Sequence, residues 1–148
     1  MDLFEAEVLA KELISQYVPR YRFAYNNLKT VNGQCNYTTC TINLSRHLTK
    51  LRTREAVTNT IMHEIAHALT PGANHGVAWK LQMRKFGLVP ERCSSDKIDR
   101  SSISNWKAVC HFCKKESFFI RKPRLERSCG DCGNKKFNPK FLLKFYQI

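Results

Sequence analysis

Three residues in the middle of the chain have the types and the spacing of a catalytic metal site. His63 and His67 are four residues apart in the run His-Glu-Ile-Ala-His. In an α-helix, residues with this spacing lie one above the other, so both imidazoles can reach a single ion. Glu64 lies beside that ion without being needed as a ligand, where it can accept a proton from bound water. The pattern indicates a zinc hydrolase, and in particular a protease.

His75 is the predicted third ligand, because a catalytic zinc takes three protein ligands and leaves a fourth position open. Pro71-Gly72 ends the helix of the first two histidines, and a short turn can bring His75 back over them. Seven residues separate His67 from His75, whereas five do so in the His-x-x-Gly-x-x-His ending of metzincins. A later carboxylate is the alternative, but Glu91 is the only one before residue 96.

A helix over residues 53–69 is expected to position the two histidines. This stretch contains no Gly or Pro. Its apolar residues recur at helical spacing and form one stripe, which consists of Val57, Ile61, Ile65 and Leu69. The histidines fall on the opposite side, so one face packs into a core while the other presents ligands. The competing interpretation, two solvent-facing helix residues, leaves the helix breaker and the third histidine unexplained.

The elements predicted around this helix make the fold class α+β, with helices packed on a short sheet. Apolar spacing predicts a first helix over residues 3–17. Strands are predicted at 21–25 and 40–44, with a turn between them at Asn32-Gly33. A further helix is predicted over about 76–86, in which Trp79 is expected to pack against the histidine helix as core.

Four cysteines in the last third of the chain have the spacing of a structural zinc site. Two Cys-x-x-Cys knuckles are separated by fifteen residues, and they consist of Cys110, Cys113, Cys129 and Cys132. Two knuckles together supply the four thiolates of a tetrahedral zinc ribbon, whereas a redox pair would carry one knuckle. Strands of this β-rich module are predicted at about 107–109, 117–121 and 136–137. We therefore expect two zinc ions per chain, one catalytic and one structural.

The polar, serine-rich stretch 94–105 is a predicted linker. It divides the chain into a metalloprotease domain over 1–93 and a zinc ribbon over 106–148. The remaining cysteines are interpreted as structural or incidental, and they are Cys35, Cys40 and Cys93.

The chain is strongly basic, with a net charge of +13, and this charge predicts a polyanionic partner. Residues 96–148 hold 13 basic and 5 acidic side chains, a net charge of +8. Cations that neutralise phosphates, mixed with rings that stack on bases, suit single-stranded or distorted DNA. No pattern reads a base sequence, so binding should be sequence-independent and salt-sensitive. The alternative is a generic solubility charge without a dedicated ligand.

The candidate DNA contacts in the ribbon are six cations, namely Lys114, Lys115, Arg121, Lys122, Arg124 and Arg127. They are interleaved with the rings of Trp106, Phe112, Phe118 and Phe119. A module this small needs aromatic residues for its own core, so we expect at least half of these rings to be buried.

Composition places the protein among folded, non-membrane proteins. Hydrophobic residues make up 43% of the chain, and no apolar run approaches the ~20 residues of a membrane span. Residues 1–5 are acidic and lack the regions of a signal peptide. Cysteines at metal-site spacing argue for a reducing compartment rather than disulfides. We expect an intracellular monomer, cytoplasmic in a prokaryote or a virus and nuclear in a eukaryote.

A longer set of residues between Val31 and Trp79 carries a family resemblance. It consists of Gly33-Gln34-Cys35-Asn36-Tyr37, Cys40-Thr41-Ile42-Asn43-Leu44-Ser45, Leu48, Lys50-Leu51-Arg52, the His-Glu-Ile-Ala-His run and His75-Gly76-x-x-Trp79. On these residues the chain resembles the SprT-like, or Spartan-type, metalloprotease family. The resemblance implies a zincin-like fold, a zinc held by His63, His67 and His75, and Glu64 as the catalytic carboxylate. It also implies DNA-dependent cleavage of proteins, notably those trapped covalently on DNA.

Three functions follow from these patterns. The leading hypothesis is a zinc-dependent, DNA-stimulated protease that cleaves DNA-bound or DNA-crosslinked proteins with water activated by zinc and Glu64. The second is a DNA-binding zinc protein whose histidine site is structural or inactive. The third is a general peptidase that does not depend on DNA. For the protease, Tyr37 and Arg54 are candidate donors to the oxyanion.

Overall fold

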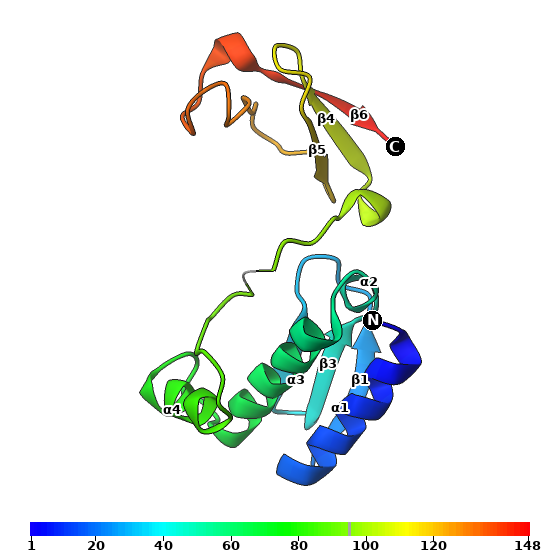
Figure 1. The fold of residues 1–148 in the computed structure, drawn as a ribbon, viewed down its shortest axis with the longest axis vertical. Helices are drawn as coiled ribbons and strands as arrows, with labels where there is room; N and C mark the ends of the chain where they lie inside the picture. The colour runs from blue at the N-terminus through cyan, green and yellow to red at the C-terminus, as the bar shows by residue number, and fades with distance from the viewer. Residues whose placement is uncertain (95) are drawn as a thin grey trace. The chain divides into compact units, whose positions relative to one another are not determined.

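The computed structural model describes residues 1–94 and 96–148, which form two compact units, Met1–Ile98 and Asp99–Ile148 (Figure 1). The fold is α+β, as the sequence predicts. The predicted linker over 94–105 includes Ser95, which lies outside the described residues. Its later part is not wholly irregular, because Ser101–Ile103 forms a short 3-10 helix, η1. The assignment of this stretch as a linker stays a prediction.

The first helix of the first unit, α1, spans Leu3–Tyr17, as apolar spacing predicts. The Asp2 side chain caps it by accepting hydrogen bonds from the backbone N–H groups of residues 4 and 5, which have no partner within the helix. One side of α1 is buried, through Ala6, Ala10 and Ile14. Small side chains at two of these positions allow the helix to approach its neighbours closely.

Three strands form the sheet of the first unit, in the order β1-β3-β2. Strands β1 (Arg22–Asn26) and β3 (Thr41–Ser45) are parallel, and β2 (Gly33–Asn36) is antiparallel to β3 and lies at an edge. The sequence predicts only a turn at Asn32-Gly33, and the strand that begins there is missed. Its four residues, Gly-Gln-Cys-Asn, carry no alternating apolar signal.

Two helices follow the sheet without a long loop. The short helix α2 (Arg46–Lys50) is capped by the Ser45 hydroxyl, and α3 (Arg54–Leu69) is capped by the Thr53 hydroxyl. Three positions of the predicted apolar stripe of α3 are buried, and they are Val57, Ile61 and Ile65. The fourth, Leu69, is 40% exposed because it is the last residue of the helix, where the chain turns away.

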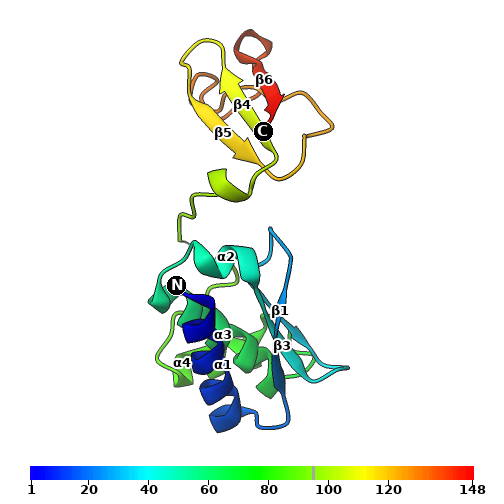
Figure 2. The same ribbon diagram turned by 90° about the vertical axis from the view of Figure 1, so that its right-hand side faces the viewer.

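The core of the first unit lies between the sheet and the helices, and Figure 2 shows the strands along one side of α1 and α3. Ile42 and Leu44 on β3 meet Ile61 and Ile65 on α3 in this layer. The last helix, α4 (Val77–Lys85), packs on the other part of α3 through a smaller cluster of Trp79, Met83 and Ala66. The active-site helix is therefore packed on both sides.

The second unit is a three-stranded antiparallel sheet in the order β5-β4-β6. Its strands are β4 (Trp106–Cys110), β5 (Glu116–Phe119) and β6 (Leu143–Gln147), and a 3-10 helix, η2 (Pro139–Phe141), precedes the last. The predicted strand at 136–137 is wrong. Asn134 and Lys135 have positive φ, so the chain there turns back on itself, and the third strand forms seven residues later.

Within the described residues, no helix is long and apolar enough to cross a membrane.

Candidate metal centre and active site

The structure brings the three predicted histidine ligands together around one point. The Nε2 atoms of His63 and His67 are 3.2 Å apart, and that of His75 lies 3.1 Å from His67 and 3.2 Å from His63. Two nitrogens bound to one tetrahedral zinc are about 3.3 Å apart. The three atoms therefore form a nearly regular triangle of the size that zinc coordination requires.

The electrostatics of this cluster favour the ligand form of each ring. Burial, and after it the neighbouring imidazoles, lower the pKa of His63 and of His67 to about 4. The pKa of His75 is lowered as well, first by burial and then by the charge of Arg92. Neutral imidazoles are the form that binds a metal ion. At neutral pH the triangle is thus uncharged and has its nitrogen lone pairs available.

Trp79 is the common neighbour of the three imidazoles. Its side chain is fully buried, as predicted for a core residue. Its ring centroid lies 4.7 Å from those of His63 and His75 and 5.5 Å from that of His67, to which it is stacked. The indole N–H also donates to the backbone carbonyl of His63 at 3.4 Å. One side chain on α4 therefore restricts the orientation of all three ligand rings.

Glu64 is buried next to the triangle, with 6% of its surface exposed. Burial raises its pKa to about 7, and a hydrogen bond from the backbone N–H of Cys35 opposes this shift. This amide belongs to β2, the strand that the sequence does not predict. The edge strand therefore holds the carboxylate that the helix presents.

Gly33 allows β2 to come this close to α3. A Cβ at this position would lie 2.7 Å from Cγ2 of Thr60 and 3.1 Å from both Cγ and Oε1 of Glu64. Real Cβ atoms essentially never approach within 3.0 Å, so a side chain here would push β2 away from the carboxylate. The only sequence signal for this contact is the glycine itself, two residues before the amide that binds Glu64.

Comparison with known proteins agrees with this geometry. The sequence profile of the SprT-like family matches residues 4–99, which include the histidine triangle, Glu64 and β2. The chain belongs to the SprT-like family. Family membership and the donor set of the triangle support a zinc metallopeptidase. No curated protein matches the sequence.

Among solved structures, the SprT-like chain is similar to that of the metallopeptidase zymogen of Methanocaldococcus jannaschii, jannalysin. The two share 17% sequence identity with a TM-score of 0.48, over 55% of this chain and 80% of jannalysin.

The four ribbon cysteines of the SprT-like chain also converge. The sulfur atoms of Cys110 and Cys132 are 3.9 Å apart, and those of Cys113 and Cys129 are 3.7 Å apart. All four sulfurs lie within 4.8 Å of one another. Two sulfurs on one tetrahedral zinc are about 3.8 Å apart. The set fits a closed structural site, in which no coordination position is left for substrate.

Each knuckle turns through residues in the left-handed region, where φ is positive. Lys114 follows the first knuckle, and Asn134 and Lys135 follow the second. Backbone hydrogen bonds close these turns, since the N–H of Lys114 donates to the carbonyl of Cys110 and that of Lys135 to the carbonyl of Gly130. Hydrogen bonds from the backbone N–H groups of Cys113 and Phe112 lower the pKa of the Cys110 thiol, which favours the thiolate that a metal binds.

All six candidate DNA contacts are exposed, but several already have partners. Lys115 is paired with Asp131, Lys122 lies over the Trp106 ring, and Arg127 lies over the Phe119 ring. The expectation that half of the four interleaved rings are buried is wrong. Phe112 and Phe118 are 67% and 37% exposed, and the other two are half-buried. The ribbon has little interior to hold them, because Cys110 and Cys129 fill much of it.

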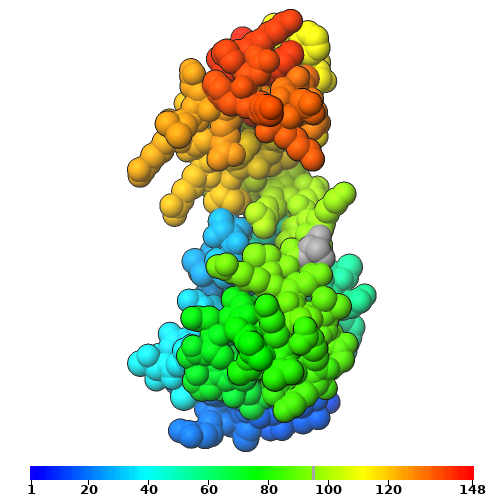
Figure 3. All heavy atoms as spheres, turned by 90° about the vertical axis from the view of Figure 1, so that its left-hand side faces the viewer, coloured from blue at the N-terminus to red at the C-terminus, as the bar shows by residue number. Residues whose placement is uncertain are grey.

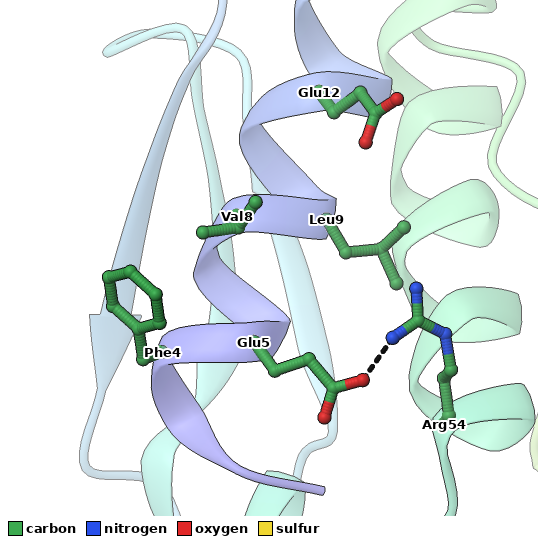
Figure 4. A pocket seen from close by; sticks show the side chains of 6 residues that line it. All are labelled: Phe4, Glu5, Val8, Leu9, Glu12 and Arg54. Atoms are coloured by element: carbon green, nitrogen blue, oxygen red, sulfur yellow. Dashed lines mark hydrogen bonds and ion pairs between the residues drawn. The ribbon is translucent and has the colours of Figure 1, made fainter.

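Arg54, one candidate oxyanion donor, is placed away from the active site. It is the first residue of α3, about 15 Å along the helix from Glu64. Figure 4 shows it in a pocket beside α1, paired with Glu5. The other lining residues come from α1, and they are Phe4, Val8, Leu9 and Glu12. Apart from Arg54, none of the predicted site residues lines this pocket.

Tyr37, the second candidate donor, lies close to the site. It follows β2 directly and is 42% exposed. Its pKa is raised by burial and then by the charges of Cys35 and Glu64, so its hydroxyl stays protonated. A protonated hydroxyl near Glu64 is able to donate a hydrogen bond.

Of the other cysteines, Cys35 packs against the core of the first unit. Burial and the nearby Glu64 raise the pKa of its thiol to about 11, which makes it a poor nucleophile. Cys40 is half-buried and Cys93 is exposed.

Proposed function

We propose that this SprT-like protein is a zinc-dependent protease that is stimulated by DNA and cleaves proteins bound or crosslinked to DNA. The proposed protease activity rests on one observation, the triangle of three Nε2 atoms with the buried Glu64 beside it. Three neutral nitrogen ligands and one adjacent carboxylate are the donor set of a catalytic zinc site with an open position.

The residues of this site fit zinc in number, type and spacing. His63, His67 and His75 would hold the ion. When bound, zinc supplies Lewis-acid activation of water and of a peptide carbonyl. The four thiolates of the ribbon would hold a second ion with a structural role.

Glu64 supplies the proton transfer in this proposal. A pKa of about 7 lets the carboxylate accept a proton during attack and return it to the leaving amine at neutral pH. The Cys35 amide holds one of its oxygens in place, so the proton moves over a short and fixed distance. Of the two candidate oxyanion donors, the proposal assigns Tyr37, because it lies near Glu64 whereas Arg54 is at the far end of α3.

Support for nucleic-acid binding comes from one open face of the ribbon sheet. Lys107 on β4 lies between Phe118 on β5 and Tyr146 on β6 in the strand register. Phe118 and Tyr146 are 37% and 50% exposed. Lys144, two residues before Tyr146, has its side chain on the same face. Lys107 is paired with Glu116 on β5 at 2.7 Å and would exchange this carboxylate for a phosphate. Two exposed rings beside such cations match the way in which single strands are bound, by stacking and by phosphate contacts.

This face adds residues to the candidate DNA contacts that the sequence predicts. Phe118 is among the predicted rings, whereas Lys144 and Tyr146 belong to a strand that the sequence places elsewhere. Binding of DNA here would keep the protease unit near proteins on the same DNA. The local substrate concentration then replaces a specific cleavage pocket as the source of selectivity.

Substitution Glu64→Gln tests the protease part. The variant keeps the size of the side chain and the hydrogen bond from Cys35 but cannot accept the proton. Zinc-loaded wild-type protein is incubated with a basic protein substrate such as a histone, with and without single-stranded DNA, and fragments are followed by gel electrophoresis. We expect Glu64→Gln to lose cleavage by about 10²-fold or more while zinc content and DNA binding are unchanged.

The same assay separates the three functions. DNA-stimulated fragmentation by the wild type supports the proposal. Tight DNA binding without fragmentation indicates a binding protein with an inactive site. Equal fragmentation with and without DNA indicates a general peptidase. Cleavage by Glu64→Gln at the wild-type rate would contradict the role of this residue.

A further inference from the structure

Arg52 is a buried cation outside the metal site. It follows α2, and its side chain is only 3% exposed. A buried charge is costly unless it is paired and fully hydrogen-bonded. The partners of this guanidinium therefore show which parts of the fold it holds together.

These partners lie in two segments that are far apart in the sequence. Nη1 of Arg52 donates to the Thr60 hydroxyl on α3 at 2.7 Å. Nε and Nη2 donate to the two carboxylate oxygens of Asp96 at 2.6 and 3.1 Å, and Nη2 also donates to the Ser94 hydroxyl at 3.0 Å. The two bonds to Asp96 form the bidentate pair that an arginine makes best.

On the α3 side, Arg52 reaches the turn that packs against β2. Thr60 is one helical turn before Glu64, and its methyl group is the atom that would collide with a side chain at Gly33. Strand β2 in turn supplies the amide that binds Glu64. Thr60 and β2 therefore lie between the guanidinium and the carboxylate of the active site.

On the other side, Arg52 holds the segment that joins the two units. We refer to residues 86–94 and 96–98, which follow α4, as the connection. The first unit ends at Ile98, so Asp96 is anchored just before the ribbon unit begins. Figure 3 shows the part of the chain that follows α4 on the surface of the first unit. Arg92 in the connection also lies close enough to His75 for its charge to act on that ring.

We propose that Arg52 is a positioning residue that couples the ribbon to the active site, by joining the end of the connection to the turn of α3 that supports Glu64. The consequence for cleavage rests on the proposed function. When nucleic acid binds the ribbon, the change in the connection reaches α3 through Asp96, Arg52 and Thr60. Breaking this link leaves an enzyme that binds DNA but responds to it weakly.

Substitution Asp96→Asn removes the charge and the bidentate pair with little risk to folding. The Asp96 side chain is 28% exposed, so an amide at this position remains partly solvated. Arg52→Lys is the second variant, because it keeps the charge but loses the forked geometry. Glu5→Gln is the matched control, since it removes the ion pair of Arg54, which also joins α3 to another element.

Hydrogen–deuterium exchange of the zinc-loaded full chain, with and without an oligothymidylate of about 20 nucleotides, gives a readout that does not depend on catalysis. In the wild type we expect DNA to slow exchange in the ribbon and to change exchange in residues 56–66. In Asp96→Asn and Arg52→Lys we expect the ribbon to remain protected and the change in 56–66 to disappear. Glu5→Gln should behave like the wild type.

Cleavage of an unfolded protein substrate gives the second readout. We expect the stimulation by DNA to fall by about fivefold or more in Asp96→Asn. Its rate without DNA and its zinc content should stay within about twofold of the wild type. A merely structural ion pair would lower both rates together, or neither.

Two results would overturn the inference while leaving the proposed function intact. One is a ribbon protected by DNA without any change in residues 56–66 of the wild type. The other is an Asp96→Asn variant that keeps the full response to DNA. A ribbon that the oligonucleotide does not protect would instead contradict the proposed function, and the inference would fall with it.

Discussion

The two candidate metal sites of this protein are built in opposite ways. The histidine site takes its candidate ligands from α3 and from the loop before α4. Trp79 on α4 orients their rings, and an amide on β2 holds Glu64 beside them. The cysteine site takes its ligands from two tight turns of one small sheet. The first has three ligands and an open side, whereas the second has four and is closed. An open site needs surrounding structure that is stable without the ion. A closed four-ligand site can itself hold its module in the folded state.

The two units also differ in how much apolar side-chain surface they bury. In the first unit a continuous core joins α1, β3 and α3. In the second unit the buried hydrophobic residues are Ala108, Cys110 and Cys129, and two of these belong to the cysteine cluster itself. A module with so little apolar interior depends on its metal for folding. We therefore expect the two units to respond differently when metal is removed.

Chelation of zinc gives the largest expected effect and tests this comparison directly. Structural zinc contributes about 10–16 kcal/mol to the folding of small metal modules, so a strong chelator should unfold residues 106–148. The first unit should keep its helices and lose only activity. Nuclear magnetic resonance of the full chain, with and without chelator, measures both units at once. Unfolding of both units together would show that the comparison is wrong.

Substitution Gly33→Ala tests the frame of the open site. The added Cβ would meet Thr60 and Glu64, so the first unit should lose about 1–3 kcal/mol of unfolding free energy, and cleavage should fall. Gly130→Ala is the control, because a Cβ there meets nothing within 4 Å. Chemical denaturation with zinc present measures the free energies. Equal stability of the two variants would mean that β2 can shift without cost.

Substitution Tyr146→Ala tests whether the open face of the ribbon binds single strands. Loss of one stacking ring costs about 1–3 kcal/mol of binding free energy. Affinity for an oligothymidylate should therefore fall about tenfold or more, while cleavage without DNA is unchanged. Fluorescence anisotropy at fixed salt measures the affinity. Leu125→Ala, at a residue that is 83% exposed and lies outside the three strands of the sheet, is the control. A similar loss in both variants would argue against stacking.

Tyr25 gives the smallest effect and concerns only the first unit. Burial raises its pKa to about 12, and its hydroxyl donates to the backbone carbonyl of Leu3 at 2.6 Å. The folded state thus holds the phenol proton more tightly than the unfolded chain, whose pKa is about 10. This stabilisation is complete below pH 10 and is lost as the pH rises toward 12. Denaturation of Tyr25→Phe should show a smaller decline over that range than the wild type.

Local sequence was sufficient for the ligands of both clusters. His63 and His67 share a helix face because four residues make about one turn, and each Cys-x-x-Cys knuckle closes within a single turn of chain. The bounds of α1 and α3 could be predicted for the same reason, since their periodicity and caps lie within a few residues. The α+β class followed from these elements.

Tertiary structure decided what surrounds those ligands. Strand β2 has no periodic apolar signal in the sequence. It forms because Gly33 allows it to lie against α3 and because the Cys35 amide donates to the Glu64 carboxylate there. The position of the third ribbon strand and the reach of Arg52 to Asp96 also depend on partners far away in the sequence. Secondary-structure propensity and residue spacing report only on residues that are close together in the sequence. Contacts between segments that are distant in the sequence form only in the folded chain, so the tertiary structure is needed to identify them.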